Sequence, residues 1–197
     1  MATEQRAEQR QVWHAIVRKL DAGRLVFVDE SATHTSLTPL YARAPKGQRA
    51  YGAVPRNHGK NTTLVAALSL EGISAAMTVE GALDTPAFEA YVEHILAPTL
   101  RPGQLVVLDN LAVHHKAAVR QTLAARGCRV LYLPSYSPDL TPIEQAFAKI
   151  KAALRRSGAR TREALEAAIA QAIDHITPRD ARGFFHHCGY RSPAQLL

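Results

Sequence analysis

The sequence of 197 residues lacks most features of secreted, membrane-spanning or disulfide-stabilised proteins. It contains two cysteines, Cys128 and Cys188, so no disulfide framework is expected and a reducing compartment is indicated. No apolar run is long enough to cross a bilayer, and the polar N-terminus has no signal-peptide core. A glycine-rich phosphate loop is also missing, which leaves nucleotide hydrolysis without support. These absences predict a cytoplasmic protein with no membrane partner.

Acidic residues are missing from one long stretch of the chain. Between Ser31 and Leu70 there is no Asp or Glu, whereas the same stretch holds five Lys and Arg residues. Folded surfaces normally mix both signs, and the whole chain has a net charge of +7 and a pI near 9.7. An anionic partner explains both observations, and nucleic acid is favoured over a membrane surface. The alternative is that this stretch is a solvated loop that happens to be basic. The predicted DNA-binding residues of this stretch are Arg43, Lys46, Arg49, Arg56 and Lys60.

The apolar pattern predicts an α/β domain, and 47% apolar residues are enough for a globular core. Strands are predicted at 24–28, 62–70, 73–79, 104–108 and 128–133, the second and third joined around Glu71-Gly72. Helices are predicted at 3–20, at 85–100 with Thr85 as a cap, at 115–126, from Pro142, after Thr161 and near Thr177. Because one helix lies between the strands at 104–108 and 128–133, a right-handed crossover and parallel pairing are expected.

The stretch from Val130 to Arg156 predicts a strand, a rigid proline-rich loop and an amphipathic helix. Thr141 and Glu144 have the spacing of a capping box at the start of that helix. Its apolar stripe consists of Ile143, Phe147, Ile150 and Leu154. Glu144 therefore has two interpretations: it closes the capping box, or it faces a site together with other acids. Capping boxes are common at helix starts, so this stretch alone favours the first.

Two upstream acids favour the second interpretation. Asp29 and Asp109 each end an apolar strand, and Glu30 must point to the opposite face from Asp29. Carboxyl ends of parallel strands and nearby helix starts meet at one crevice, so Asp29, Asp109 and Glu144 are expected to converge. Three carboxylates would raise one another's pKa unless a cation lay between them, and such ligands suit Mg²⁺ or Mn²⁺. Two ions about 3.5–4 Å apart would support phosphoryl transfer. Taken singly, either Asp is better explained as a turn residue.

Three segments resemble the catalytic motifs of DDE transposases. They are V-D-E-S at Val28–Ser31, L-D-N-L at Leu108–Leu111 and Y-L-P-S-Y-S-P-D-L-T-P-I-E-Q at Tyr132–Gln145. The best likeness is to the mariner-like superfamily and its bacterial insertion-sequence relatives, where 34 residues also typically separate the last two acids. Two further segments resemble the bacterial branch: Y-A-R-A-P-K-G-Q-R at Tyr41–Arg49 and H-C-G-Y at His187–Tyr190.

The resemblance implies a ribonuclease H-like α/β fold, a mixed five-stranded sheet flanked by helices with extra C-terminal helices. Its parts would be an N-terminal helix at 1–22, the catalytic domain at 23–158 and a packed helical extension at 159–197. The family's acidic triad corresponds to Asp29, Asp109 and Glu144, and it holds two Mg²⁺ ions, with Mn²⁺ as a substitute. The implied activity is cleavage of DNA at transposon ends and transfer of the 3′-hydroxyl to target DNA, in a bacterial cytoplasm at the nucleoid.

Two residues beside the triad also fall on recurrent family positions. Asn110 is a candidate to orient Asp109, whereas His114 has no assigned role, and neither is predicted to bind metal. Lys151 and Arg155 extend a basic track from the triad along the helix that begins at Pro142, and phosphate contact is predicted for both.

Family members carry helix-turn-helix modules ahead of the catalytic domain, and none is legible here. A separate chain is therefore expected to supply one, and the resemblance implies a homodimer on DNA. The alternatives are a non-catalytic DNA-binding or subunit-binding remnant of a split or truncated transposase, and another nuclease on the same fold. His186, His187 and Cys188, with His175, lack a second cysteine arm for zinc, so a packed C-terminal helix is predicted instead.

Overall fold

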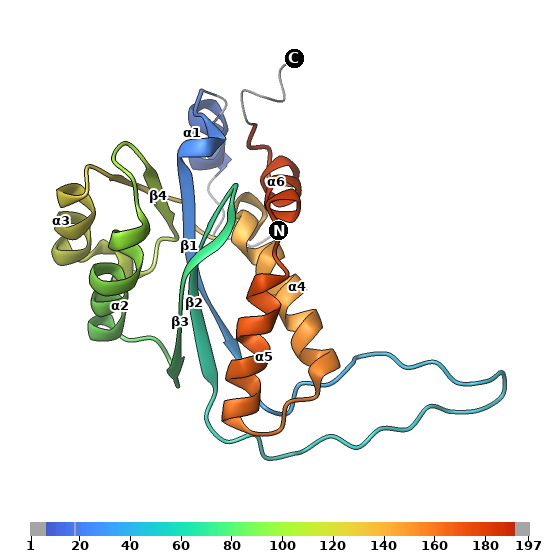
Figure 1. Ribbon diagram of the computed structural model, residues 1–197. Coiled ribbons are helices and arrows are strands. Elements are labelled where there is room, and N and C mark those ends of the chain that lie inside the picture. The colour runs from blue at the N-terminus through green and yellow to red at the C-terminus, as the bar shows by residue number, and fades with distance from the viewer. Residues whose placement is uncertain (1–6, 18, 192–197) are drawn as a thin grey trace.

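The structure is a computed structural model that describes residues 7–17 and 19–191. Its centre is a five-stranded sheet in the order β3-β2-β1-β4-β5 (Figure 1). The strands are β1 (Leu25–Thr33), β2 (Thr62–Ser69), β3 (Gly72–Glu80), β4 (Leu105–Leu108) and β5 (Arg129–Tyr132). β1 pairs antiparallel with β2 and parallel with β4, β2 pairs antiparallel with β3, and β4 pairs parallel with β5. The predicted mixed five-stranded sheet is confirmed.

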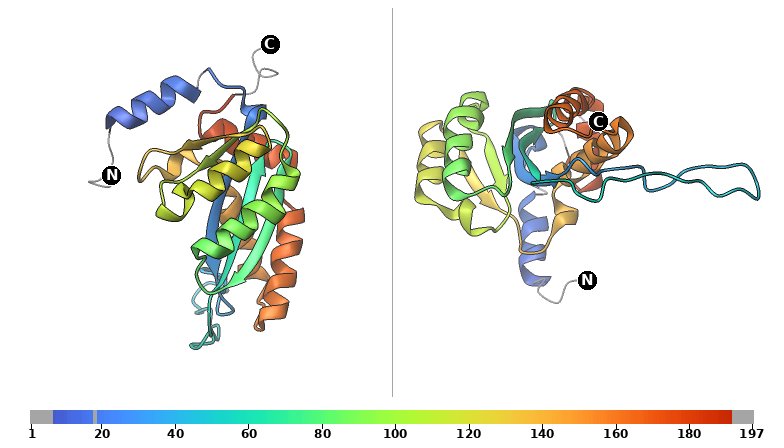
Figure 2. Two further views of the ribbon diagram at one scale, coloured as in Figure 1. Left: turned by 90° about the vertical axis from the view of Figure 1, so that its left-hand side faces the viewer. Right: turned by 90° about the horizontal axis from the view of Figure 1, so that it is seen from below.

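Helices cover both faces of the sheet (Figures 1 and 2). One face carries α4 (Pro142–Ser157), α5 (Arg162–Asp174) and α6 (Pro178–His187), and the other carries α2 (Thr85–Tyr91) and α3 (Ala117–Ala125). β1 serves both layers, because its side chains alternate: Leu25 and Phe27 join the first core, and Val26 and Val28 join the second. The central strand is thus buried on both faces.

Several boundaries differ from the sequence prediction. The helix after β3 is capped by Asp84, whose carboxylate accepts from the Ala87 amide at 2.9 Å, and not by Thr85. That helix continues as a π turn (Val92–Leu96) and a 3-10 turn (Ala97–Thr99). A 3-10 turn (Ala112–His115) precedes α3, which begins at Ala117. The first helix, α1, is described from Ala7 to Val17, and the predicted start at Thr3 lies outside the described residues.

The two ends of the described chain meet near the loop that precedes α4. Trp13 donates its indole N–H to the Tyr190 hydroxyl at 3.1 Å, and that hydroxyl donates to the Leu140 carbonyl at 2.5 Å. Arg10 reaches the same loop, with a guanidinium nitrogen 2.6 Å from the Asp139 carboxylate and another 2.9 Å from the Ser137 hydroxyl. α1 is therefore fastened to the loop at residues 137–140.

The C-terminal helix is packed as the sequence predicted. Phe185 and Tyr190 make edge-on contacts with Phe27 at ring-centroid distances of 5.3 and 5.0 Å. Cys188 is buried, whereas His186 and His187 are exposed. No helix within the described ranges is long and apolar enough to span a bilayer.

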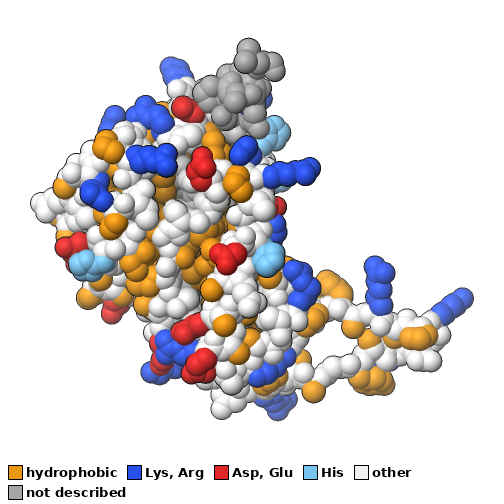
Figure 3. Space-filling view, in the orientation of Figure 1, with side chains coloured by type: hydrophobic (Ala, Val, Ile, Leu, Met, Phe, Trp, Pro, Cys, Tyr) orange, Lys and Arg blue, Asp and Glu red, His pale blue; other side chains and the backbone are white. Residues whose placement is uncertain are grey.

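A long segment leaves the body between β1 and β2. Residues 34–61, called here the basic excursion, contain neither helix nor strand and project well beyond the domain (Figures 1 and 2). Basic and apolar side chains both stand on this projection (Figure 3). Its two ends are adjacent, since Thr33 and Thr62 form the last pair of the β1–β2 ladder. The excursion is thus an insertion at the end of a hairpin.

Candidate active site

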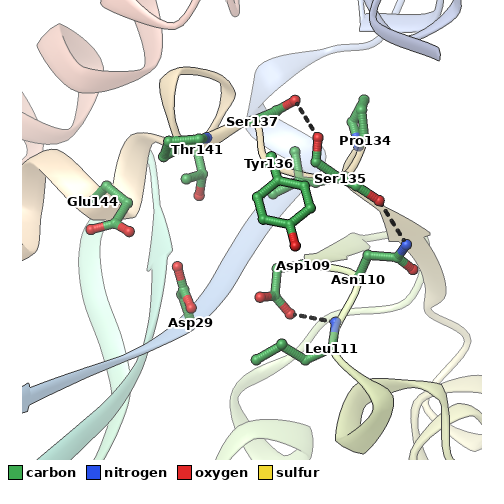
Figure 4. A pocket seen from close by; sticks show the side chains of 12 residues that line it. Asp29, Asp109, Asn110, Leu111, Pro134, Ser135, Tyr136, Ser137, Thr141 and Glu144 are labelled. Carbon is green, nitrogen blue, oxygen red and sulfur yellow. Dashed lines mark hydrogen bonds between the residues drawn. The ribbon is translucent and has the colours of Figure 1, made fainter. Parts of the chain in front are cut away.

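Three elements bring acidic side chains to one crevice. β1 and β4 run parallel, and the last pair between them is Phe27 with Val107, so Asp29 and Asp109 each lie two residues further along. The first turn of α4 brings Glu144 to the same place, and all three residues line a crevice of about 450 Å³ (Figure 4). The predicted convergence of Asp29, Asp109 and Glu144 is present in the structure.

The sequence predicted that Asp29 ends its strand, but in the structure β1 continues past it. β1 continues to Thr33 because β2 pairs with it along this length, from Asp29 with Ala66 to Thr33 with Thr62. On the other side, β4 ends at Leu108. The crevice opens where β1 loses its parallel neighbour. Asp29 therefore stands on a strand held by β2 on one side and open on the other.

The predicted capping box at α4 is wrong. The Thr141 side chain makes no capping hydrogen bond, and the Glu144 amide donates to the Thr141 carbonyl at 3.3 Å instead. Both side chains line the crevice (Figure 4). The 3-10 turn Pro138–Leu140 precedes α4, and Thr141, which lies between the two, is buried. Glu144 is consequently free of the capping role that competed with a role in the site.

Burial sets the electrostatics of the crevice. Burial raises the pKa of Asp29 to about 7. The Glu30 amide, which donates to Asp29 Oδ1 at 2.8 Å, acts in the opposite direction and lowers this pKa. The charges of Glu30, Asp109 and Glu144 raise it further. Burial likewise raises the pKa of Glu30. A bound cation would remove this penalty, so the donor set of the crevice has the chemistry of a Mg²⁺ or Mn²⁺ site. Within the described ranges, no three His, Cys, Asp or Glu side chains converge tightly enough for a single ion.

Asp109 is held by its own turn. Its Oδ1 accepts from the Leu111 amide at 3.0 Å and lies 2.5 Å from Nδ1 of His114. Asn110, the residue considered for orienting Asp109, is engaged elsewhere: it donates to the Ser135 hydroxyl at 3.1 Å, and its oxygen lies 2.6 Å from Nε2 of His115. The contact expected of Asn110 is thus made by His114.

Tyr136 is a crevice residue that the sequence did not single out. It is the one non-glycine residue of the described chain at positive φ, 54°, and the residue is 61% exposed. An aromatic residue in the left-handed region carries strain, which often accompanies a functional loop. The motif Y-S-P-D drew attention to this loop, but the left-handed conformation had no sequence signal, because it is neither Gly nor Asn.

The predicted DNA-binding residues lie outside the crevice. Arg43, Lys46, Arg49 and Arg56 are exposed on the basic excursion, and the structure brings none of them to the acids. Lys60, at its end, pairs with Glu80 at 2.8 Å, and Glu80 also pairs with Arg162. Lys151 and Arg155 are half-buried on α4. They lie about 10 and 16 Å along the helix axis from Glu144 at 1.5 Å per residue.

The sequence from residue 24 to residue 166 matches the model of one protein family, the DDE superfamily endonucleases. These residues include all three acids of the crevice. The chain belongs to the DDE superfamily endonucleases. No curated protein matches the sequence.

Solved structures support the same conclusion for the fold of this endonuclease chain. A pre-cleavage Mos1 transpososome matches with a TM-score of 0.75 and 20% identity, over 92% of this chain and 57% of that one. The Mos1 mariner paired end complex with Mn matches with a TM-score of 0.71 and 21% identity, over 94% and 58%. The catalytic domain of Mos1 mariner transposase matches with a TM-score of 0.64 and 17% identity, over 92% and 85%. The ribonuclease H-like fold is therefore confirmed, and the chain spans less than three-fifths of the transposase chains in the two complexes.

Proposed function

We propose that this endonuclease domain is the catalytic domain of a DNA transposase. It would cleave DNA at transposon ends and transfer the freed 3′-hydroxyl to target DNA. The observation that carries the proposal is the crevice itself, where the carboxylates of Asp29 on β1, Asp109 just after β4 and Glu144 on α4 share one opening. A binding module has no use for three acids beside DNA, because they repel phosphate. Membership of the bacterial insertion-sequence branch rests on the motifs quoted above.

Asp29, Asp109 and Glu144 are proposed to hold two Mg²⁺ ions, for which Mn²⁺ can substitute. When bound, the ions would activate the attacking oxygen and neutralise charge at the phosphate. Among the relatives, Mos1 paired end complexes with Mn and with Mg support divalent metal use. The chain's own residues orient these ligands: the Glu30 amide fixes Asp29, and the Leu111 amide fixes Asp109. Thr141 and Ser137 border the space in which a phosphate would lie.

The partner is proposed to be DNA, gripped by the basic excursion and by Lys151 and Arg155 on α4. A homodimer on paired ends is proposed by analogy with the Mos1 paired-end complexes. A separate chain with the helix-turn-helix module is proposed to supply recognition of the terminal repeats. The domain division at residues 22 and 158 belongs to the same proposal.

Nicking of supercoiled plasmid in Mg²⁺ or Mn²⁺ tests the proposal. The wild type is expected to nick, whereas Asp109→Ala and Glu144→Ala are expected to bind the plasmid and leave it supercoiled. Glu93→Ala, at an exposed acid that does not line the crevice, is the matched control and is expected to nick like the wild type. Binding without nicking in every protein would favour the alternative, a DNA-binding or subunit-binding remnant.

Strand transfer separates a transposase from another nuclease of the same fold. A labelled duplex with a free 3′-hydroxyl, mixed with plasmid, is expected to become joined to it in a reaction that requires Asp109. Efficient nicking with no joined product, even with an added recognition module, would assign a simple endonuclease instead.

A further inference from the structure

We propose that His114 and Glu30 are positioning residues that fix which oxygen of Asp109 faces the crevice. The inference deepens the proposed function and rests on it. His114 is fully buried, and each of its ring nitrogens faces a carboxylate. Nδ1 lies 2.5 Å from Asp109 Oδ1, and Nε2 lies 3.7 Å from Glu30 Oε2. Glu30, His114 and Asp109 therefore form one chain of polar groups behind the crevice.

The inner end of this chain is enclosed. Glu30 Oε2 and His114 Nε2 are both buried and have no hydrogen-bond partner among the described residues. Buried polar atoms almost always have a partner, and these two atoms face each other, so each is the available partner of the other. Glu30 stands on the opposite face of β1 from Asp29, which keeps it out of the crevice lining. One strand thus supplies one acid to the crevice and the next to its support.

The imidazole ring has little freedom to move. It packs on the Phe88 ring at a centroid distance of 4.5 Å, and the Tyr132 hydroxyl donates to the His114 carbonyl at 3.0 Å. A histidine that merely fills the core would not need an acid at each nitrogen. The rigid ring instead transmits the position of Glu30 to Asp109.

The consequence for Asp109 is a choice between its two oxygens. Both protein contacts, from the Leu111 amide and from His114 Nδ1, are made to Oδ1. The other oxygen is turned toward Asp29 (Figure 4). A carboxylate held in this way offers one oxygen in one direction, which a metal ligand requires, and an outer partner of this kind typically changes metal affinity by about 10–100-fold.

The test replaces His114 by residues that keep one nitrogen at a time. The amide nitrogen of Asn can stand near Nδ1, and that of Gln near Nε2. Binding of Mn²⁺ alone to the DNA-free chain is measured by calorimetry, beside plasmid nicking and the unfolding temperature. His114→Gln and His114→Ala are expected to bind Mn²⁺ about 10–100-fold more weakly. His114→Asn keeps the contact with Asp109 but loses the one with Glu30, so it is expected to weaken Mn²⁺ binding less than His114→Gln and to about the same extent as Glu30→Ala. The exposed control His94→Asn is expected to match the wild type.

Glu30→Gln and Glu30→Ala test the far end of the chain. Gln keeps an oxygen toward His114, so a small effect is expected, whereas Ala is expected to weaken Mn²⁺ binding in the same direction as His114→Gln. Comparison of Asn with Gln at position 114 remains decisive if the alanine variants fail to fold. Folded His114→Gln with wild-type Mn²⁺ affinity would overturn the positioning role while leaving nicking, and hence the proposed function, intact. If Mn²⁺ binding depends on His114 but the chain never nicks, the proposed function would be contradicted and the positioning role of His114 would stand.

Discussion

The crevice and the basic excursion are built in opposite ways. The crevice takes its acids from β1, from the turn that follows β4 and from the start of α4, so that Asp29 is fixed by the sheet, Asp109 by its turn and Glu144 by the helix. The excursion has no regular structure and is attached only near its root, where Arg160 donates to the carbonyls of Thr35 and Leu37 at 2.9 Å, and His34 stacks on His58 at 4.5 Å. The acids of the crevice are thus arranged by folding, whereas the basic side chains of the excursion stand away from the domain, where we propose that they meet DNA.

Removing the basic excursion is expected to give the largest difference between DNA binding and metal binding. Replacement of residues 38–57 by a short Gly-Ser linker is expected to keep the fold, because Thr33 and Thr62 already pair at its base. Plasmid binding should weaken strongly and nicking should be lost, whereas calorimetric Mn²⁺ binding should stay. The slope of log affinity against log salt is expected to fall by about four, one for each Lys or Arg removed. Full plasmid affinity in this variant would show that DNA lies elsewhere.

The buried acid of the crevice predicts a pH-dependent stability. The pKa of Asp29 is raised to about 7, above the value of ~3.9 in an unfolded chain. Between these two pH values the native state binds more protons, so the unfolding free energy of the metal-free chain falls as pH rises through this window. Asp29→Asn removes the effect and is expected to stabilise the chain at pH 8 by on the order of a few kcal/mol, at ~1.4 kcal/mol per pKa unit.

Urea unfolding in EDTA between pH 4 and pH 8 measures this difference. Asp174→Asn, at an exposed acid, is the matched control and should follow the wild type at each pH. Mg²⁺ is expected to stabilise the wild type at pH 8 more than Asp29→Asn, because it relieves the same penalty. Parallel stability curves for wild type and Asp29→Asn would contradict the prediction.

Two arginines of the excursion allow a finer test of its role. Arg43→Ala with Arg49→Ala is expected to lower the salt slope of plasmid binding by about two and to leave unfolding unchanged, because both side chains are exposed. Arg179→Ala with Arg182→Ala removes the same charge from α6 and serves as the control. Equal losses in the two double variants would mean that net charge, and not the excursion, governs binding.

The smallest effect is expected at the root of the excursion. Arg160→Ala should change the unfolding free energy by less than about 0.5 kcal/mol, as exposed substitutions usually do. It should speed hydrogen exchange at residues 34–38 and weaken DNA binding by about two- to fivefold, since ordering a looser segment costs roughly 0.5–1 kcal/mol more. The neighbouring exposed Arg156→Ala is the control. Unchanged hydrogen exchange at residues 34–38 in Arg160→Ala would show that Arg160 does not anchor the excursion.

The sequence predicted the sheet and the convergence of the acids because both depend on local patterns and on the general geometry of parallel strands. It missed the true length of β1, because the partner that extends it, β2, follows after the whole excursion. The Thr141 motif and the Thr177 motif look alike, yet only Thr177 forms a capping box, with Asp180. Tertiary packing decides between them. The sequence singled out His114 but could not predict its two partners, because only the fold brings Asp109 and Glu30 to the same imidazole.

The fastening of α1 to residues 137–140 makes the start of the chain mechanically continuous with the crevice wall. Ser137 belongs to the crevice lining and is also a contact of Arg10. A pull or a steric push on α1 would therefore displace one wall of the crevice and leave β1 and β4 where they are. A bulky tag placed ahead of α1 is for this reason expected to perturb the crevice.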